Sequence, residues 1–563
     1  MMTITLTKTV RRLLILVALA AALPLFPGAA RPMASAQDDA PTTDTGSLVL
    51  VASDEPSSAT PRGPQVLRLA GPSQGPESLD PALARDLQST FFVRQVFRGL
   101  TRLDADLVPV PELAERIEVA ADGLEYRFLL RADAVFQDGR PITADDVAFS
   151  LARALDPRTA GDEAALLAGP TYLSDIEGAA DLIAGRATEL TGVRVVDERT
   201  LTIRLAAPRA SFLMKLAGSS AVVVDRNQVG DGEWWRVPNG SGPFRLAEWV
   251  PEDHLVLTRA DAYWGGTPPL ERVEVRLGPN AFQPYNLYEA GEVDVAGLPI
   301  EAVDRVLAPA SPTRDEVVVT PLFAVGYIAF RADVPPMDDP HVRRAVQLAF
   351  PRDKVAAVSF NGHVAAASGP VPPGMLGREW SVDAEPYDLE AARREIAASR
   401  YGSAAAVPPL RVYGADYGGA AALREVLEED LGLAVEVISV DWPEYNDGLR
   451  RRSYPAYELY WGADYPDPES ILWSLFGSDS ADNYIDYRNA VFDDLLRAAA
   501  EELDPERRAG LYAQAQQTLV DDHVVLPLYH DVGYTLARPY VKGLQITALG
   551  ILRLDSVWLE HEA

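Results

Sequence analysis

The chain has 563 residues, more than one hydrophobic core normally supports, so we expect roughly two to four lobes. Its formal net charge of −31 excludes nucleic acid as a partner, because binding to phosphate requires a surplus of Lys and Arg. The absence of cysteine excludes disulfides, thiolate nucleophiles, Cys-ligated zinc, iron–sulfur clusters and a cysteine-linked lipid anchor.

The first 36 residues have the pattern of an export signal. Basic residues between positions 8 and 12 precede the apolar run Leu13–Leu25, and Ala34-Ser35-Ala36 offers a cleavage site of small residues. The apolar run is shorter than the roughly 20 residues of a membrane-spanning helix. Residues 1–36 are therefore predicted to be a signal peptide, with an uncleaved membrane anchor as the alternative. The mature protein is expected to be soluble and either periplasmic or extracellular.

The remainder of the chain interleaves strands and helices. Residues 37–64 are rich in Asp, Pro, Ser and Thr and are predicted to be a flexible linker, despite the short apolar run Leu48–Val51. Regular structure is expected to begin with a strand at Gln65–Leu69, and Thr143–Asp146 has the pattern of a helix-capping box. Further strands are predicted at Glu125–Arg131, Leu201–Leu205, Val273–Leu277, Arg411–Tyr413 and Val435–Val440, and helices at Val147–Leu155, Val342–Phe350, Leu389–Arg400, Leu423–Leu431 and Glu506–Val520. The pattern predicts a mixed α/β protein without internal repeats.

Patterns that would indicate an enzyme are weak. Gly71–Gly75 matches G-x-S-x-G, but that motif requires a helix to begin at the serine, and Ser73 is followed by a proline-rich loop. Asp464 and Asp467 are close enough in sequence for a glycosidase pair, yet Pro466 between them favours opposite sides of a turn. The six histidines include no i,i+4 pair. No catalytic residue, cofactor or metal site is predicted.

Aromatic residues beside Gly, Pro and acids are the most distinctive local feature. The stretch Tyr457–Ser470 places four of them around Asp464 and then contains two prolines. Aromatics beside loop-forming residues suit a binding cleft better than a closed core. The stretch is therefore either a sheet edge with a turn, or a pocket that holds a ligand by stacking and by one charge. Other aromatics of this kind are Trp234-Trp235, Trp249, Tyr263-Trp264, Trp442 and Tyr445.

A series of motifs in consistent order extends over Leu67–Leu544, nearly the whole mature chain. It comprises Ser78–Pro81, Val96–Thr101, Val110–Glu115, Asp122–Arg131, Phe136–Val147, Gly240–Phe244, Tyr263–Gly266, Ala290–Val295, Asp339–Val346, Pro351–Val355, Tyr457–Ser470 and Tyr540–Leu544. This series closely resembles the family 5 extracellular solute-binding proteins of ABC transporters, which include oligopeptide, dipeptide and nickel binders. Because many motifs agree in order and spacing, the resemblance is specific.

The resemblance implies a periplasmic-binding-protein-like, two-lobed α/β fold (type II, cluster C) with an extra subdomain. Lobe I would combine residues 65–97, 218–322 and 530–563, the extra subdomain would be 98–217, and lobe II would be 323–529. The lobes would close on a ligand about a hinge. The implied role is a monomeric, non-enzymatic receptor that captures peptides and delivers them to the permease subunits of an ABC importer.

The resemblance also implies a ligand site. In the peptide-binding members, the aspartate of W-x-A-D-Y pairs with the α-amino group of the peptide, and that position is Asp464. The segments Gly326-Tyr327 and Tyr460–Gly462 would pair with the ligand backbone as an added strand, and Trp442 and Trp461 would wall its side-chain pockets. The implied ligand-binding residues are Asp464, Trp461, Tyr460, Gly462, Trp442, Tyr327, Gly326, Leu87 and Glu458.

Two departures from the family pattern leave the ligand open. Glu458 stands where some oligopeptide binders have arginine, and the loop Gly414–Gly419, where dipeptide binders tend to hold the ligand's carboxylate, contains no arginine. The alternatives are a longer peptide, a cationic solute, or a non-peptide solute such as a sugar, an opine or a metal chelate. A secreted hydrolase with an aromatic cleft is the alternative from a different class.

Overall fold

The computed structural model describes residues 48–52, 63–71, 75–161, 167–230, 232–278, 283–415 and 418–560. The predicted signal peptide and Ser73 lie outside these residues. Among the residues described, no helix combines the length and apolar character that crossing a membrane requires.

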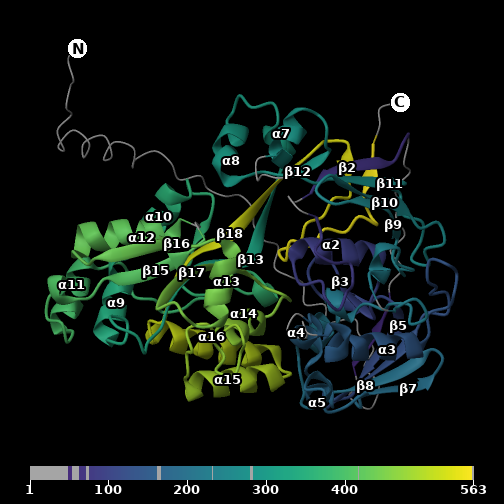
Figure 1. Ribbon diagram of the computed structural model, residues 1–563, viewed down its shortest axis with the longest axis horizontal. Helices are drawn as coiled ribbons and strands as arrows, with labels where there is room; N and C mark the ends of the chain where they lie inside the picture. Colours follow the sequence, from purple (N-terminus) through teal and green to yellow (C-terminus); the bar gives the residue numbers. More distant parts are fainter. Residues whose placement is uncertain are drawn as a thin grey trace. The chain divides into compact units, whose positions relative to one another are not determined.

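Two long antiparallel strands, β13 (Val317–Phe330) and β18 (Val525–Ala537), lie at the centre of the largest sheet (Figure 1). In the part of the chain that the structure describes, this sheet has eleven strands in the order β16-β15-β17-β13-β18-β12-β2-β11-β10-β9, and β14 pairs with β18. The pairing of β13 with β18 shifts its register between Pro321 and Val325. One half of the sheet thus lies on the β17 side of this pair and the other half on the β12 side.

The half on the β12 side has a core in which strand alternation is clear. In β2 and β11 the residues Leu67, Leu69, Val273 and Val275 are buried, because successive side chains of a strand point to opposite faces. They pack with Phe92 and neighbouring residues of a helix. The elements of this half are β2 (Val66–Ala70), β9 (Phe244–Val250), β10 (His254–Arg259), β11 (Arg272–Arg276), β12 (Val295–Gly297), α2 (Leu87–Val96), α7 (Gln283–Glu289) and α8 (Ile300–Leu307).

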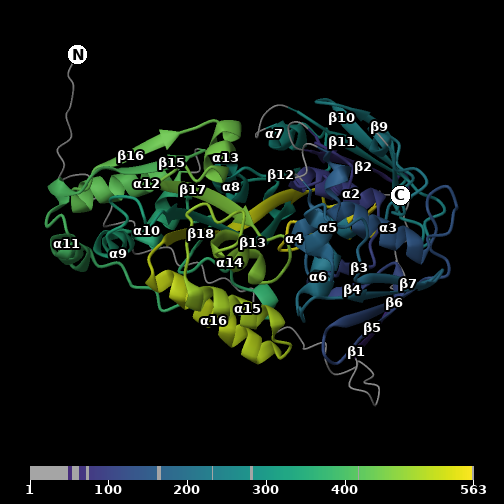
Figure 2. The same ribbon diagram turned by 60° about the horizontal axis from the view of Figure 1, so that its bottom comes forward.

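The half on the β17 side is covered on both faces. In β13, Ile328 and Phe330 join a core with α9 to α12, whereas Tyr327 and Ala329 join a core with α13 to α16 (Figures 1 and 2). A strand buried on both faces must be apolar throughout, as Phe323–Phe330 is. The elements are β14 (Ala365–Ala366), β15 (Leu410–Gly414), β16 (Val435–Ser439), β17 (Ala456–Gly462), α9 (Pro340–Ala349), α10 (Arg352–Ser359), α11 (Leu389–Ala398), α12 (Gly419–Val426), α13 (Trp442–Arg450), α14 (Glu469–Phe476), α15 (Ala490–Glu501) and α16 (Pro505–Asp521).

A second, five-stranded sheet in the order β1-β5-β6-β8-β7 forms a separate core with α3 to α6. Helix α3 begins at the predicted capping box: Asp146 accepts a hydrogen bond from the backbone N–H of Thr143 at 3.0 Å. The elements are β1 (Leu48–Val51), β5 (Ala114–Val119), β6 (Glu125–Leu130), β7 (Val193–Asp197), β8 (Thr200–Arg204), α3 (Ala144–Leu155), α4 (Gly169–Leu173), α5 (Ala179–Ile183) and α6 (Phe212–Leu216). Two short pairs complete the structure: β3 (Thr101–Leu103) with β4 (Pro109–Pro111), and β19 (Val541–Lys542) with β20 (Trp558–Leu559).

Strand β1 corrects one expectation. Leu48–Val51 lies inside residues 37–64, which were predicted to be an unstructured linker, but it pairs antiparallel with β5 from Leu48 opposite Val119 to Val51 opposite Arg116. The side chain of Val49 is buried against the sheet. Local composition did not reveal this strand, because its partner lies more than sixty residues further along the chain and supplies the free sheet edge.

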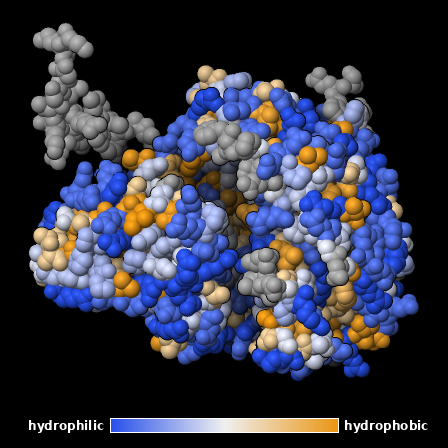
Figure 3. Space-filling view, viewed as in Figure 1, coloured by the Kyte–Doolittle hydropathy of each residue, from blue (hydrophilic) through white to orange (hydrophobic). Residues whose placement is uncertain are grey.

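The surface reflects the composition. The face in Figure 3 is mostly hydrophilic, in accordance with the 82 acidic and 51 basic residues of the chain. Near the centre of this face the surface is hollowed, and hydrophobic residues are visible in the hollow.

Candidate ligand-binding site

Strand β17 carries the predicted site at its C-terminal end. It pairs antiparallel with β13 along its whole length, up to Gly462 opposite Ala324. Its parallel pairing with β15 is confined, among the described residues, to Tyr457 opposite Tyr413, so Trp461 and Gly462 extend beyond that strand. Gly462 is exposed, and a Cβ atom added there would meet no atom within 4 Å. The end of β17 therefore leaves room for another backbone to approach closely.

Asp464 lies two residues after the end of β17, and backbone hydrogen bonds hold this segment in place. The preceding N–H of Ala463 donates to the carbonyl of Phe323 at 2.8 Å, and the N–H of Asp464 donates to the hydroxyl of Ser470 at 2.9 Å. The carboxylate is half-buried, and within the described part of the chain it forms no ion pair. Burial raises its pKa to about 7, the nearby charge of Asp482 adds to this, and Arg85 opposes it. A cationic ligand group would stabilise such a half-buried carboxylate more than it would stabilise a carboxylate on the open surface.

The pKa of Asp464 predicts a pH-dependent effect on stability. A folded-state pKa of about 7, against an ordinary value of 3.8, means that ionisation disfavours the folded state. The stability contributed by the protonated carboxyl is complete below about pH 4 and is lost as the pH rises to about 7. Asp464→Asn, which cannot ionise, should therefore raise Tm relative to the unaltered protein at pH 8, and by less at pH 4.5. Thermal unfolding without ligand measures this; an equal shift at both pH values would contradict it.

Three of the predicted aromatic residues lie in β17 or in the first turn of α13. Trp461 is half-buried, and its Nε1 has no hydrogen-bond partner among the described residues. The hydroxyl of Tyr460 donates to Asp531 at 2.9 Å. Trp442 occupies the first turn of α13, is 51% exposed, and lies with its ring 6.1 Å from that of Tyr445. Trp442 and Trp461 thus present apolar surface that a ligand side chain can cover.

Gly326 and Tyr327 occupy different positions from those expected. In β13 both residues pair with strands on either side: Gly326 with Tyr460 and Tyr529, and Tyr327 with Leu459 and with β18. The ring of Tyr327 is fully buried in the core. An added strand therefore has no place beside them, and the prediction that they bind ligand backbone is wrong. Their apolar, glycine-containing sequence fits a central strand as well as a binding edge, and the sequence alone did not distinguish the two.

Glu458 also has a different role from the one expected. It is 2% exposed, and its two carboxylate oxygens accept hydrogen bonds from the backbone N–H groups of Gly419 (2.7 Å) and Ala420 (2.8 Å). These groups begin α12, so the carboxylate stabilises a helix N-terminus. A Cβ atom on Gly419 would lie 2.6 Å from Glu458 Oε1, so glycine is needed there. Glu458 is thus buried in the core of this half of the sheet, where it holds the start of α12.

Leu87, the last of the predicted ligand-binding residues, lies at the start of α2. It is 80% exposed and follows Asp86, whose carboxylate caps the helix by accepting from the N–H of Ser89 at 2.8 Å. Its exposure leaves it accessible to a ligand.

Asp467 does not share a site with Asp464. It is fully buried, it pairs with the guanidinium of Arg508, and it accepts a hydrogen bond from the hydroxyl of Tyr512 at 2.8 Å. A glycosidase needs two carboxylates directed into one cleft. Because Asp467 forms a buried ion pair with Arg508, Asp464 and Asp467 do not form the carboxylate pair of a glycosidase.

Tyr172 lies beside the site and was not predicted from the sequence. Its ring is 6.5 Å from that of Tyr465, in an edge-on arrangement, and Tyr465 is the residue after Asp464. Burial raises the pKa of Tyr172, and the charge of Asp464 raises it further. Tyr172 lies almost 300 positions earlier in the sequence, in α4, and no local pattern links it to Tyr457–Ser470.

Comparison with known proteins decides the family. The family model for bacterial extracellular solute-binding proteins, family 5 (middle region), matches residues 108–483. The chain belongs to this family. The probable deoxycholate-binding periplasmic protein YgiS of Escherichia coli is 29% identical to this solute-binding protein over 511 residues, 88% of this chain and 94% of the relative. The periplasmic oligopeptide-binding protein OppA of Escherichia coli is 28% identical over 514 residues, 88% of this chain and 92% of the relative.

Solved structures confirm the fold class of this solute-binding protein. The murein tripeptide-binding protein MppA of Escherichia coli superposes with a TM-score of 0.76 at 25% identity, covering 89% of this chain and all of that chain. OppA of Haemophilus influenzae, solved in complex with RPPGFSPFR, superposes with a TM-score of 0.74 at 23% identity, covering 89% of this chain. The two-lobed α/β fold predicted from the resemblance is thus confirmed.

Proposed function

We propose that this solute-binding protein is the exported substrate-binding component of an ABC importer, and that it captures peptides and delivers them to a membrane permease. The observation that carries the proposal is Asp464: a half-buried carboxylate without an ion pair among the described residues, beside the open end of β17. An ammonium group that binds there loses its hydration water, and the negative charge of the carboxylate compensates this loss. The peptide-binding relatives support the same ligand class.

The architecture expected from the family fits this role. Lobe I would comprise residues 65–97, 218–322 and 530–563, lobe II residues 323–529, and the extra subdomain residues 98–217. Strands β13 and β18 pass between the two large lobes in this division and would form the hinge region. The protein acts in this proposal as a receptor without catalytic activity, and its permease is the partner that reads the ligand-bound state.

Mass spectrometry of small molecules released by denaturing the purified protein tests the proposal. Peptides with free amino termini are expected, and the Asp464→Asn protein, purified in parallel, should release less of them. A sugar, a bile acid or a metal chelate released in stoichiometric amount, with no peptide, would contradict the peptide assignment. The bile acid is included because one relative is named as a probable deoxycholate-binding protein.

A further inference from the structure

A buried ion cluster joins helix α14 to the part of the chain built on the five-stranded sheet with α3 to α6, which we call the five-stranded unit. Ser211 directly precedes α6, and Lys215 lies four residues later, one turn along the same side of that helix. Both reach the carboxylate of Glu469, the first residue of α14. The hydroxyl of Ser211 donates to Oε2 at 2.7 Å, and Nζ of Lys215 donates to Oε1 at 3.2 Å. Two donors of one helix thus hold one carboxylate of the other.

The cluster continues inside the five-stranded unit, and its charges balance only when Glu469 is in place. Asp175 binds both Nζ of Lys215 and the guanidinium of Arg209, each at 2.9 Å. The five-stranded unit therefore contributes two cations and one carboxylate, and Glu469 adds the second carboxylate. The side chains of Lys215, Asp175 and Glu469 are 5%, 10% and 11% exposed. Burial alone would lower the pKa of Lys215, but the charges of Glu469 and Asp175 outweigh burial and raise it.

Further contacts cross the same boundary. The backbone N–H of Ala210 donates to the carbonyl of Ala500 in α15 at 3.3 Å, and the guanidinium of Arg209 lies 3.8 Å from the carboxylate of Glu501. In Figures 1 and 2, α4 of the five-stranded unit lies beside α14. The segment that leads into α6 thus docks on both α14 and α15.

The cluster also reaches the residue next to Asp464. The amine of Lys215 lies over the ring of Tyr465, 5.1 Å from its centroid, and Tyr172 packs edge-on against the same ring at 6.5 Å. Tyr465 is 4% exposed, so two side chains of the five-stranded unit help to enclose it. Ser470, whose hydroxyl accepts from the backbone N–H of Asp464, directly follows the carboxylate that the cluster holds. Both ends of the segment from Asp464 to Ser470 therefore lie next to contacts with the five-stranded unit.

We propose that Lys215 is a positioning residue for the ligand site: by joining α6 to Glu469 and Tyr465, it holds Asp464 in the half-buried place where a ligand's ammonium group binds strongly. The inference rests on the proposed function and extends it, because strong binding then depends on the docking of the five-stranded unit. Lys215 acts through its two contacts and not by touching the ligand. Removal of its amine leaves the carboxylates of Asp175 and Glu469 buried with one cation fewer. The two parts of the chain then separate more readily at this boundary, because separated carboxylates regain water.

Calorimetry and stopped-flow kinetics with Ala-Ala-Ala at pH 7 test the inference. Lys215→Met should weaken binding by about tenfold or more, with most of the loss in faster dissociation, and Glu469→Gln should weaken it by about threefold or more. The two losses should not multiply in the double variant, because each single change breaks the same contact. Glu469→Gln decides the question if Lys215→Met fails to fold.

The pH profile of binding distinguishes positioning from a general loss of structure. Burial raises the pKa of Asp464 to about 7, so binding to the unaltered protein should strengthen between pH 5 and about pH 7. In Lys215→Met the same rise should lie below about pH 5, because a carboxyl that regains water titrates near its ordinary value of 3.8. Asp482, Arg85 and Tyr172, which interact electrostatically with Asp464, are intact in this variant. A purely structural role of Lys215 would leave the profile of the folded protein unchanged.

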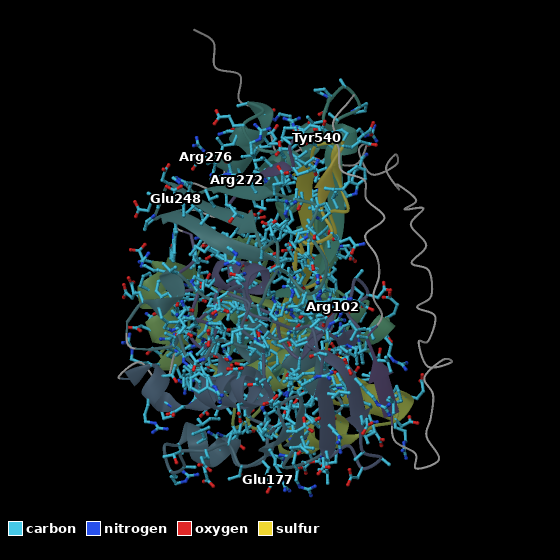
Figure 4. All side chains as sticks on the ribbon, turned by 90° about the vertical axis from the view of Figure 1, so that its right-hand side faces the viewer. Arg102, Glu177, Glu248, Arg272, Arg276 and Tyr540 are labelled. Atoms are coloured by element: carbon cyan, nitrogen blue, oxygen red, sulfur yellow. The ribbon has the colours of Figure 1, made fainter. Side chains whose placement is uncertain are left out.

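Lys542→Met and Glu177→Gln are the matched controls, because they make the same substitutions on the surface. Lys542 is 40% exposed at its side chain and pairs with Glu560 at 3.3 Å. Glu177 pairs with Arg204 at 3.1 Å, and it is labelled at the bottom of Figure 4, far from Tyr540 at the top. Both controls should leave the affinity and the pH profile unchanged. An unchanged affinity and profile in Lys215→Met, or equal losses in the controls, would overturn the inference.

Hydrogen exchange without peptide separates this inference from the proposed function. The N–H of Ala210 donates across the boundary, so its exchange rate reports docking, and Lys215→Met should increase that rate by about tenfold or more. If peptides bind in an Asp464-dependent manner but bind Lys215→Met equally well, the positioning role is refuted and the peptide receptor stands, whatever the exchange rate. If no peptide binds but exchange at Ala210 and Tyr465 increases in Lys215→Met and not in the controls, the docking by Lys215 stands and the peptide assignment fails. Absence of peptide binding together with unchanged exchange refutes both.

Discussion

Replacing Asp464 with Asn should weaken the binding of peptides with a free amino terminus by about 2–5 kcal/mol, because the ligand's ammonium would be left buried without a counter-charge. The substitution preserves size and shape, so the loss reports the charge. Calorimetry with Ala-Ala-Ala at pH 7 measures it. In the unaltered protein, affinity should rise from pH 5 to about pH 7, since Asp464, with a pKa of about 7, must ionise before it can pair. Above about pH 8 affinity should fall as the peptide's own amino group loses its proton.

Two controls separate this effect from a general loss of charge. Asp479→Asn removes an exposed carboxylate from the same region of the chain and should leave affinity unchanged. N-acetylated Ala-Ala-Ala, which has no ammonium group, should bind both the unaltered protein and Asp464→Asn weakly and to a similar extent. Unchanged affinity of Asp464→Asn for the free-amine peptide would remove Asp464 from the site.

Features determined by local sequence were predictable. The capping box at Thr143–Asp146 is satisfied within one turn of helix, so its four residues contain all the necessary information. Helix α11 begins at Leu389 as predicted, because Asp388 caps it by accepting from the N–H of Ala391 at 2.8 Å. The motif that contains Asp464 was recognisable from its order in the chain, whereas the role of Asp464 in binding stays a prediction.

Features that depend on partners distant in sequence were not predictable. Glu458 was predicted to bind ligand because it belongs to the motif around Asp464. Its contact with the N-terminus of α12, some forty residues earlier, could not be read from that motif. Arg98 binds Asp555, which lies 457 positions further along the chain, so no window of sequence contains both residues. The prediction that Gly326 and Tyr327 pair with ligand backbone was wrong for a related reason. Whether a strand is central or at an edge depends on the strands that flank it, which is a property of the complete sheet.

The turn that positions Asp464 should depend on the buried pair behind it. Replacing Arg508 with Met would leave the carboxylate of Asp467 fully buried and without its cation, and we expect the free energy of unfolding to fall by about 3–5 kcal/mol. Asp467 also accepts hydrogen bonds from the hydroxyl of Tyr512 at 2.8 Å and from the backbone N–H of Glu469 at 3.0 Å, but two neutral hydrogen bonds do not compensate a buried charge. Urea unfolding without ligand measures the change.

Arg507→Met is the matched control for this prediction, because it alters the adjacent residue in the same helix. The side chain of Arg507 is 72% exposed and pairs with Glu502 and Asp504 on the surface, so the expected loss is less than about 1 kcal/mol. Adding Asp467→Asn to Arg508→Met should restore part of the lost stability, since the uncompensated charge is then removed. Similar small losses in both single variants would show that Asp467 reaches water when Arg508 is absent.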